Sequence, residues 1–439
     1  MTTVAFGCHV RLAGVAARIN RFLRSWRELR RPRVLKPGPY EETDMREDFL
    51  LLNPGPVPVT REVRQAMSEP MVSHRSAEFE AVYERAQDAL DHVFTQSTLD
   101  GESTATDGTS LVFNGTATMA MEAAVANLVG TLSGRGDDGK VVPLVNGKFG
   151  RRFKRIADRY ASVDPVEATW GHSIDLDEVR ETVDDDTDVV TMVHNETSTG
   201  LLNPVEEVGE IAADHDATFV VDGVTSIGGD EFRIDDWNVD VAVTDAQKCL
   251  AAPPGTSAMY ATEEAQAAFD GDAAPFYEDL DWHLRKADSH QTPFTSAVPL
   301  FRGLAIAVED IVDEGMPERI ERHREQSKAF REAFTAMGLD LFAERNDATE
   351  YSNTLTGVSL PAHTRENPEA FFDAIEERGV SISGGQAHLG GEIFRVSNMG
   401  NLSSEQILRG VRTIGEAFEE TGEDVDTETG VEAAREILR

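Results

Sequence analysis

The chain has 439 residues, 40% of them hydrophobic and 7% aromatic, and it carries a formal net charge of −38 at pH 7. This length predicts two or three packed units, and no stretch approaches the ~20 consecutive apolar residues of a membrane-spanning helix. The negative charge excludes nucleic-acid binding, which needs basic surface to neutralise phosphates. A strongly acidic surface is typical of proteins that stay soluble in concentrated salt, and it indicates a halophilic source.

Cys8 and Cys249 are the only cysteines in the sequence. Two cysteines cannot build a disulfide framework or a cysteine-based zinc site. We therefore expect no bound metal and a reducing, cytoplasmic location.

The beginning of the chain differs in charge from the rest. Residues 1–44 hold nine basic and four acidic side chains, whereas the remainder is strongly acidic. An arginine-rich, acid-poor start resembles an organelle-targeting segment; the alternative is an over-extended reading frame whose true start is Met45. In both cases we expect residues 1–44 to be a leader outside the folded core.

The folded part is predicted to begin with an extended N-terminal arm over 45–60, because prolines block a central strand there. Helical spacing of apolar residues follows over 60–95, and the polar stretch 96–110 predicts a loop. From residue 111 onward, short apolar runs alternate with helical patterns. We predict strands at 111–113, 141–145, 189–193, 217–221 and 239–243, and helices at 117–130, 150–160, 175–183 and 205–215.

This alternation is typical of an α/β fold with a mostly parallel sheet between layers of helices. We assign the large domain to 61–310. A long helix at 317–338 and later strand patterns predict a smaller C-terminal α+β domain over 311–420. Residues 421–439 are assigned to an acidic tail: the stretch 418–429 has the composition of a solvated segment, and the short amphipathic piece after it is expected to pack weakly. Ligands of parallel sheets bind beyond the carboxyl ends of the strands, so we looked for chemistry there.

Lys248 and Asp222 follow two neighbouring strands of the predicted sheet. Lys248 is one of seven lysines in the chain, against 34 arginines, so lysine is avoided almost everywhere that only charge is needed. A partly desolvated lysine amine forms a Schiff base, which arginine cannot do. Asp222 closes an apolar run, where a carboxylate can meet a pyridinium nitrogen. This is the polar pair that pyridoxal phosphate needs.

Other positions in or just after predicted strands carry further candidates, most of them with a structural alternative. Thr116 lies at a predicted helix start, which suits a phosphate or a simple helix cap. Phe149 can stack on a cofactor ring or belong to the core. Thr197 can donate to a phenolate oxygen. Arg395 lies inside an apolar strand, where it needs either a substrate carboxylate or a structural ion pair.

Together these motifs resemble the class V aminotransferases, which are fold type I pyridoxal-phosphate enzymes, and are most similar to alanine–glyoxylate and serine–pyruvate aminotransferases. The resemblance covers about residues 50 to 415. It rests on motifs that occur in the family's order, namely Leu-Asn-Pro-Gly-Pro (52–56), Ser-His-Arg-Ser-Ala-Glu-Phe (73–79), Asn-Gly-Thr-Ala-Thr (114–118), Asn-Gly-Lys-Phe-Gly (146–150), Glu-Thr-Ser-Thr-Gly (196–200), Val-Asp-Gly-Val-Thr-Ser (221–226), Gln-Lys (247–248) with Pro-Pro-Gly (253–255), and Phe-Arg-Val-Ser (394–397).

The resemblance implies a role for each motif. Lys248 would hold the cofactor and move the proton, Asp222 would pair with the ring nitrogen, and Arg395 would hold the substrate carboxylate. The remaining cofactor contacts would come from Thr116, Ala117, Thr118, Phe149, Thr197 and Gln247, with Thr292 and Thr295 reaching the phosphate of a partner subunit in a homodimer, and Gly55 near the substrate. Ala117 departs from the family, which commonly has glycine there.

The implied reaction transfers an amino group from alanine, serine or aspartate to a 2-oxo acid such as glyoxylate or pyruvate. Phosphoserine or 2-aminoethylphosphonate transamination is an alternative on the same scaffold, and it needs an extra basic cluster, for which His74 and Arg75 are candidates. Cysteine desulfuration would need a nucleophilic cysteine on a mobile loop. A catalytically silent binding protein would have lost Lys248 or Asp222, and both are present.

Overall fold

The computed structural model describes residues 49–105, 107–132, 139–272 and 274–439. The leader predicted over 1–44 and the alternative start at Met45 lie outside these ranges. No helix in the described ranges is long and apolar enough to cross a membrane.

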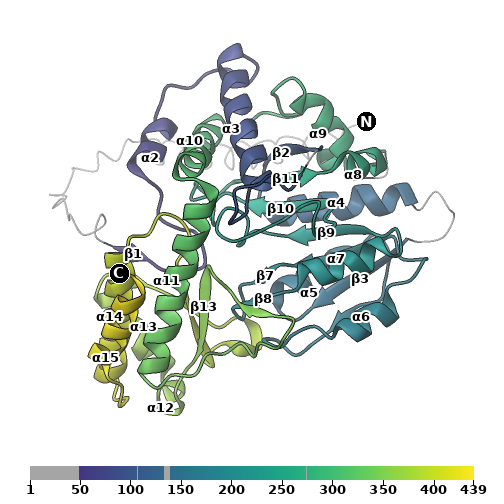
Figure 1. Ribbon diagram of the computed structural model, residues 1–439. Helices are drawn as coiled ribbons and strands as arrows, with labels where there is room; N and C mark the ends of the chain where they lie inside the picture. The colour runs from purple at the N-terminus through teal and green to yellow at the C-terminus, as the bar shows by residue number, and fades with distance from the viewer. Residues whose placement is uncertain (1–48, 106, 133–138, 273) are drawn as a thin grey trace, which may run out of the picture. The chain divides into compact units, whose positions relative to one another are not determined.

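A central, mostly parallel sheet confirms the predicted α/β class (Figure 1). Its strand order is β2-β11-β10-β9-β6-β3-β4, and β5 also pairs with β3. The strands are β2 (Thr109–Asn114), β3 (Lys140–Val145), β4 (Ser162–Val163), β5 (Val166–Glu167), β6 (Val189–Val193), β9 (Thr218–Asp222), β10 (Val241–Asp245) and β11 (Thr256–Ala261).

Strand β11 was not predicted. It runs antiparallel to both of its neighbours, β10 and β2. Its sequence, Thr-Ser-Ala-Met-Tyr-Ala, has few β-branched residues, so it gave no strand signal, although all six residues are buried and the sheet supplies the pairing.

Helices flank this sheet. They are α2 (Arg61–Met67), α3 (Ala77–Thr95), α4 (Ala117–Leu132), α5 (Lys148–Ala157), α6 (Leu176–Thr182), α7 (Val205–Ala213), α8 (Glu263–Ala268), α9 (Leu280–Ala287) and α10 (Val298–Glu314). The helical pattern predicted over 60–95 is two helices. The second is capped by Ser76, whose side chain accepts a hydrogen bond from the Phe79 amide, as N-cap residues do.

A second apolar core lies around α11 (Met316–Ala336). In this core, α11 is joined by a sheet of order β13-β16-β15 and by three further helices. Figure 1 shows these helices beside the lower part of α11. The elements are β13 (Leu355–Ser359), β15 (Ser383–Gly384), β16 (Ile393–Ser397), α13 (Pro368–Glu377), α14 (Ser404–Glu420) and α15 (Thr427–Ile437). Ile320 belongs to the first core and Ala329 to the second, so the change of core falls within α11. The domain limits given above stay a prediction.

The amphipathic piece at the end of the chain belongs to helix α15, which buries Val431 and Ala434 in the second core. These two apolar positions are three residues apart, the spacing of one helix face. The stretch 418–429 is not solvated throughout, because Phe418 and Thr427 are buried. The arm also joins this core, since Leu50 and Leu51 pair with β14 (Val380–Ser381).

Candidate active site

The carboxyl ends of three parallel strands meet at one edge of the central sheet. In the strand register, Asp222 at the end of β9 lies between Val193 of β6 and Val243 of β10. The segments that follow these strands carry Thr197 and Lys248. The sheet therefore brings together groups that are far apart in the sequence.

These segments enclose a recess of about 310 Å³. Eight of the site residues predicted from the sequence line it, namely Thr116, Ala117, Thr118, Phe149, Thr197, Asp222, Gln247 and Lys248. Among the other lining residues are Lys148, Arg152, Asn195, Thr225, Asp245 and Gln386, for which we proposed no role from the sequence.

The Lys248 side chain is held in a mostly buried position against the N-terminal arm. Its Nζ donates a hydrogen bond to the Pro54 carbonyl oxygen. Burial lowers the pKa of this amine, and Arg395 lowers it further, although Asp245, Cys249 and Asp222 act in the opposite direction. A lowered amine pKa increases the neutral, nucleophilic fraction.

Gly55 is placed where only glycine fits. It has a φ of +89°, and a Cβ atom there would lie 2.6 Å from the Lys248 Nζ. A side chain at this position would displace the lysine amine and strain the backbone. The arm thus belongs to the wall around Lys248.

Asp222 is a buried carboxylate with little to neutralise it. It is 4% exposed, and its Oδ1 accepts one hydrogen bond, from the Val224 amide at 2.9 Å. Burial raises the pKa of this carboxyl to about 7, and the nearby Glu196 adds to that rise. A protonated ring nitrogen would supply the missing positive charge, so this side chain suits the pyridine ring of pyridoxal phosphate.

The start of α4 is the candidate phosphate site. Asp245 lines the recess beside this helix start, and burial raises the pKa of its carboxyl. Arg152 brings a positive charge to the same place, because its Nη1 donates to Thr118 Oγ1 at 2.7 Å. Gln247 lines the same recess, and its side-chain NH2 group can donate to a phosphate oxygen. Thr116, Ala117, Thr118, Gln247 and Arg152 all line the recess here, and their hydroxyl, amide and guanidinium donors suit a phosphate.

Glu196 fixes the position of Phe149. Its Oε2 accepts hydrogen bonds from the Phe149 and Gly150 amides at 3.0 and 3.2 Å, at the N-terminus of α5, where a negative charge is stabilising. The Arg152 guanidinium lies 4.7 Å from the centre of the Phe149 ring. Phe149 is only partly buried and lines the recess, so a planar ring can stack on it.

Arg395 is buried without an acidic partner. It donates to the Thr197 carbonyl at 2.8 Å and to the Gly384 carbonyl at 2.8 and 3.1 Å. No carboxylate of the described chain lies within ion-pair distance of it, and burial lowers the pKa of its guanidinium to about 10. Of the two alternatives for this residue, the structural ion pair is absent from the described contacts. The positive charge of Arg395 is therefore available to a substrate carboxylate.

Thr292 and Thr295 do not line this recess. Their loop is held by Arg75, which donates to the Gln291 side chain and to the Thr292 and Pro293 carbonyls at 2.6 to 2.9 Å. Thr292 is buried and Thr295 is exposed. Arg75 is thus engaged in shaping a loop, which weakens its candidacy as part of a substrate-phosphate cluster.

A fully buried arginine, Arg319, lies behind the catalytic loops and was missed from the sequence. It donates to the Gly228 carbonyl at 2.6 Å and to the Cys249 carbonyl at 2.7 Å, and it pairs with Glu314 at 2.6 Å. Gly228 follows Asp222 in one loop, and Cys249 follows Lys248 in the other. Arg319 therefore ties together the two loops that carry the central pair.

Comparisons with known proteins agree with this geometry. The family described as class-V aminotransferases matches residues 49–409. An uncharacterized aminotransferase of Methanocaldococcus jannaschii is 35% identical, over 89% of this chain and 97% of that protein. The L-aspartate–glyoxylate aminotransferase of Paracoccus denitrificans is 31% identical, over 88% of this chain and 95% of that protein. Among solved structures, pyridoxamine–pyruvate aminotransferase from Mesorhizobium loti superposes with a TM-score of 0.79 at 26% identity, covering 89% of this chain and 96% of that one.

The matches span nearly the whole described chain, and the fold, Lys248 and Asp222 suit the chemistry they imply. The chain belongs to the class V aminotransferase family and is a transaminase that uses pyridoxal 5′-phosphate.

Proposed function

We propose that this enzyme transfers an amino group between a small amino acid (alanine, serine or aspartate) and a 2-oxo acid such as glyoxylate or pyruvate. The observation that carries the proposal is Arg395, a buried guanidinium without an acidic partner beside the recess that holds Lys248. Both partners of such a reaction carry a carboxylate next to the reacting carbon, which a guanidinium binds through two parallel hydrogen bonds. One relative is named for its use of glyoxylate and another for its use of pyruvate, which supports the choice of these two 2-oxo acids as amino acceptors.

The residues divide the work as follows. Pyridoxal phosphate, when bound, supplies the electron sink that stabilises negative charge on the substrate carbon. Lys248 Nζ would hold the cofactor and, once free, would carry the proton between the two reacting carbons. Asp222 would keep the ring nitrogen protonated, and Thr197 would donate to the ring oxygen. Arg395 orients the substrate carboxylate.

We further propose that the enzyme is a homodimer in which Thr292 and Thr295 reach the partner's phosphate site. Both lie outside the recess of their own chain, on a loop that Arg75 holds in a defined shape. Mixing a Lys248→Ala variant with a Thr292→Ala/Thr295→Ala variant tests this, because a shared site restores activity to a fraction of the mixed dimers. If mixing restores none while the wild type is dimeric, the shared site is wrong.

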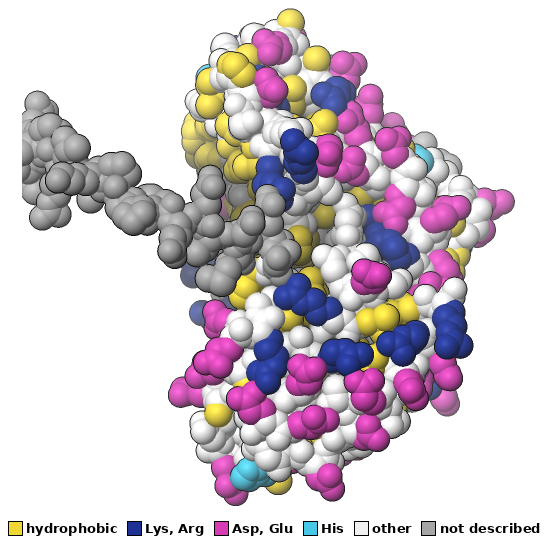
Figure 2. Space-filling model, turned by 90° about the vertical axis from the view of Figure 1, so that its left-hand side faces the viewer, with side chains coloured by type: hydrophobic (Ala, Val, Ile, Leu, Met, Phe, Trp, Pro, Cys, Tyr) yellow, Lys and Arg dark blue, Asp and Glu magenta, His cyan; other side chains and the backbone are white. Residues whose placement is uncertain are grey.

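A halophilic, cytoplasmic setting also belongs to the proposal. The net charge is −38, and Figure 2 shows Asp and Glu side chains scattered over most of the face it draws.

Cys249 is fully buried, and burial raises the pKa of its thiol to about 12. A thiol of this kind is a poor nucleophile, which disfavours cysteine desulfuration at this residue.

A donor–acceptor matrix tests the proposal directly. Purified holoenzyme is incubated with each of alanine, serine and aspartate against each of glyoxylate and pyruvate, and both products are quantified. We expect turnover in at least one pair, and none with Lys248→Ala as control. A holoenzyme that moves no amino group in any pair would overturn the proposed substrates.

A further inference from the structure

Helix α5 presents a row of basic side chains along one face. Lys148, Arg151, Arg152 and Arg155 lie at spacings of three and four residues, which places them on the same side of a helix. Arg159 follows just after the helix ends. This is an unusual concentration of positive charge in a chain with 79 acidic and 41 basic residues.

The row lines a second recess, of about 500 Å³, next to the cofactor recess. The two recesses share Thr118, Lys148 and Arg152. Trp170 and Ala387 also line the outer recess, and the Arg151 guanidinium lies 4.8 Å from the Trp170 ring. An anion in the outer recess would therefore lie close to a substrate in the inner one.

Acidic side chains leave this row unneutralised. No carboxylate in the described ranges is within ion-pair distance of the four basic residues of the row or of Arg159, although Lys154 on the same helix pairs with Asp158 at 3.4 Å. Glu122, the one acidic residue lining the recess, accepts a hydrogen bond from the Tyr160 hydroxyl at 2.9 Å. Lys154, which lies outside the recess, is therefore paired with a carboxylate, whereas the basic side chains that line the recess are not.

Like charges at this spacing destabilise a helix unless something offsets their repulsion. The mutual effect is visible at Lys148, whose pKa is lowered by partial burial and by its neighbours Arg152 and Arg395. Lys148 therefore feels both the row and the buried arginine that we assign to the substrate carboxylate. An anion is the natural counterpart for such a surface.

We propose that α5 and Trp170 form a subsite for a second anionic group, a carboxylate or a phosphate, on the amino acid or 2-oxo acid substrate. Arg395 then holds the carboxylate beside the reacting carbon, and Arg151 and Arg155 attract the distal anion, with Lys148 between the two sites. This inference rests on the proposed function and narrows it to acidic substrates. It favours aspartate over alanine and serine, and it gives the phosphoserine alternative a basic cluster that Arg75 does not supply.

The test compares an Arg151→Gln/Arg155→Gln holoenzyme with the wild type and with Lys154→Gln, which removes one positive charge from the same helix outside the recess. Values of kcat/KM are measured for aspartate, O-phosphoserine and alanine at one fixed ionic strength. We expect the wild type to prefer an acidic donor, and the double variant to lose at least ~10-fold more kcat/KM with that donor than with alanine. Lys154→Gln should behave as wild type. The preferred acidic donor distinguishes a carboxylate from a phosphate.

A binding measurement separates this inference from the proposed function. Calorimetric titration of the same three holoenzymes with succinate and with butyrate, which has one carboxylate fewer, requires no turnover. Weaker succinate binding in the double variant alone, with butyrate unchanged, supports the subsite even if the proposed donors fail. Equal losses for all donors, equal losses in Lys154→Gln, no preference for an acidic donor, or unchanged succinate binding would each overturn the subsite.

Discussion

Two buried arginines of this enzyme have opposite surroundings. Arg319, in α11, is paired with Glu314, and it also donates to two loop carbonyls and to the Asn401 side chain. Arg395, in β16, is similarly buried, and within the described part of the chain its guanidinium donates to the carbonyls of Thr197 and Gly384 and has no carboxylate at ion-pair distance. The first charge is neutralised within the protein, whereas the second is not.

This difference distinguishes an arginine that stabilises the fold from one that can bind a ligand. A buried charge is costly unless a partner compensates it, and the fold supplies that partner for Arg319. For Arg395 the substrate would supply it, so the cost of burying the guanidinium is offset only when the ligand is present. The same reasoning applies to Asp222, a buried carboxylate that a protonated ring nitrogen would neutralise.

The largest expected effect is the loss of protein stability when Arg319 is replaced. Arg319→Met removes a buried partner of Glu314 and leaves the Gly228 and Cys249 carbonyls without their donor. We expect the free energy of unfolding to fall by about 3–5 kcal/mol. Chemical denaturation of both proteins measures the change. Arg395→Met is the matched control and should lose far less stability, and an equal loss in the two variants would erase the distinction drawn here.

Asp222 extends the comparison to a buried anion. In the unfolded chain an aspartate loses its proton near pH 4, whereas in the cofactor-free folded protein the pKa of Asp222 is about 7. Between these values the folded state binds more protons, so this carboxyl makes the protein less stable as the pH rises from about 4 to 7, with a constant cost above that range.

Asp222→Asn removes this titration. Measured on cofactor-free protein, the stability of the variant relative to the wild type should therefore increase from pH 4 to 7, by at most about 4 kcal/mol. The holoenzyme variant should lose activity in spite of that gain. A difference in stability that does not change with pH would show that the Asp222 carboxyl is not held in a destabilised state.

For Arg395 the expected effect is on catalysis. Arg395→Met should lower kcat/KM about 30- to 100-fold for every amino donor, since a charge-assisted contact to the substrate carboxylate is worth about 2–3 kcal/mol. Arg395→Lys should recover part of the loss, because it keeps the charge without the two parallel hydrogen bonds. Steady-state kinetics with the best donor of the matrix provides the measurement. Unchanged kcat/KM in Arg395→Met would remove this residue from the substrate site.

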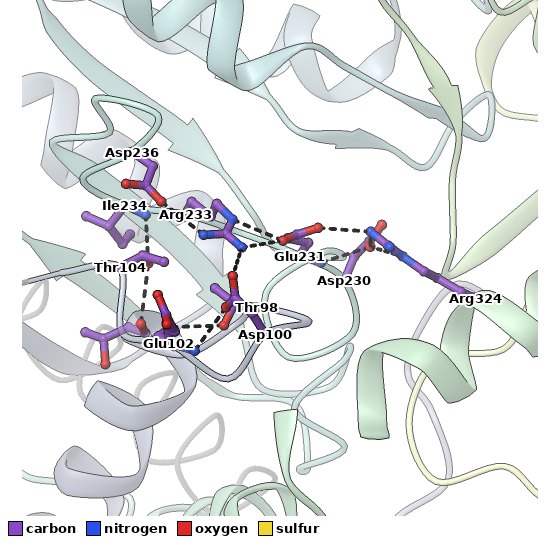
Figure 3. A network of polar contacts seen from close by, with 11 residues as sticks. Thr98, Asp100, Glu102, Thr104, Asp230, Glu231, Arg233, Ile234, Asp236 and Arg324 are labelled. Carbon is purple, nitrogen blue, oxygen red and sulfur yellow. Dashed lines mark hydrogen bonds and ion pairs between the residues drawn. The ribbon is translucent and has the colours of Figure 1, made fainter. Parts of the chain in front are cut away.

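The smallest effect is expected at a surface network. Figure 3 shows Arg233 among three carboxylates, Asp100, Glu231 and Asp236, at 2.8 to 3.0 Å. Solvent screens such pairs, so Arg233→Ala should cost about 1 kcal/mol or less, and less still in high salt. Denaturation at two salt concentrations measures this change. A loss as large as that of Arg319→Met would mean that accessible ion pairs stabilise this protein as strongly as buried ones.

The alternation of strands and helices was predictable because a buried parallel sheet leaves continuous β-branched runs in the sequence. The residues at strand ends were predictable for a related reason: parallel strands place their carboxyl ends at one edge of the sheet, so the motifs that follow them converge. Eight of the predicted positions line one recess. Their individual roles still rest on the resemblance and on the experiments above.

What the sequence concealed depends on tertiary partners. Arg319 lies among charged residues of a helix, and only the fold shows that its side chain is fully buried. Strand β11 owes its conformation to its two neighbours rather than to its own residues. The basic row on α5 was visible as composition, yet its lack of carboxylate partners is a property of the folded surface.

One measurement tests the central claim most directly. Treating the resting holoenzyme with borohydride and mapping its peptides by mass should place a single pyridoxyl group on the Nζ of Lys248. Lys148, which lines the same recess, should stay unmodified and serves as the internal control. A modified Lys148, or no modified lysine in a protein that retains its cofactor, would contradict the assignment of Lys248.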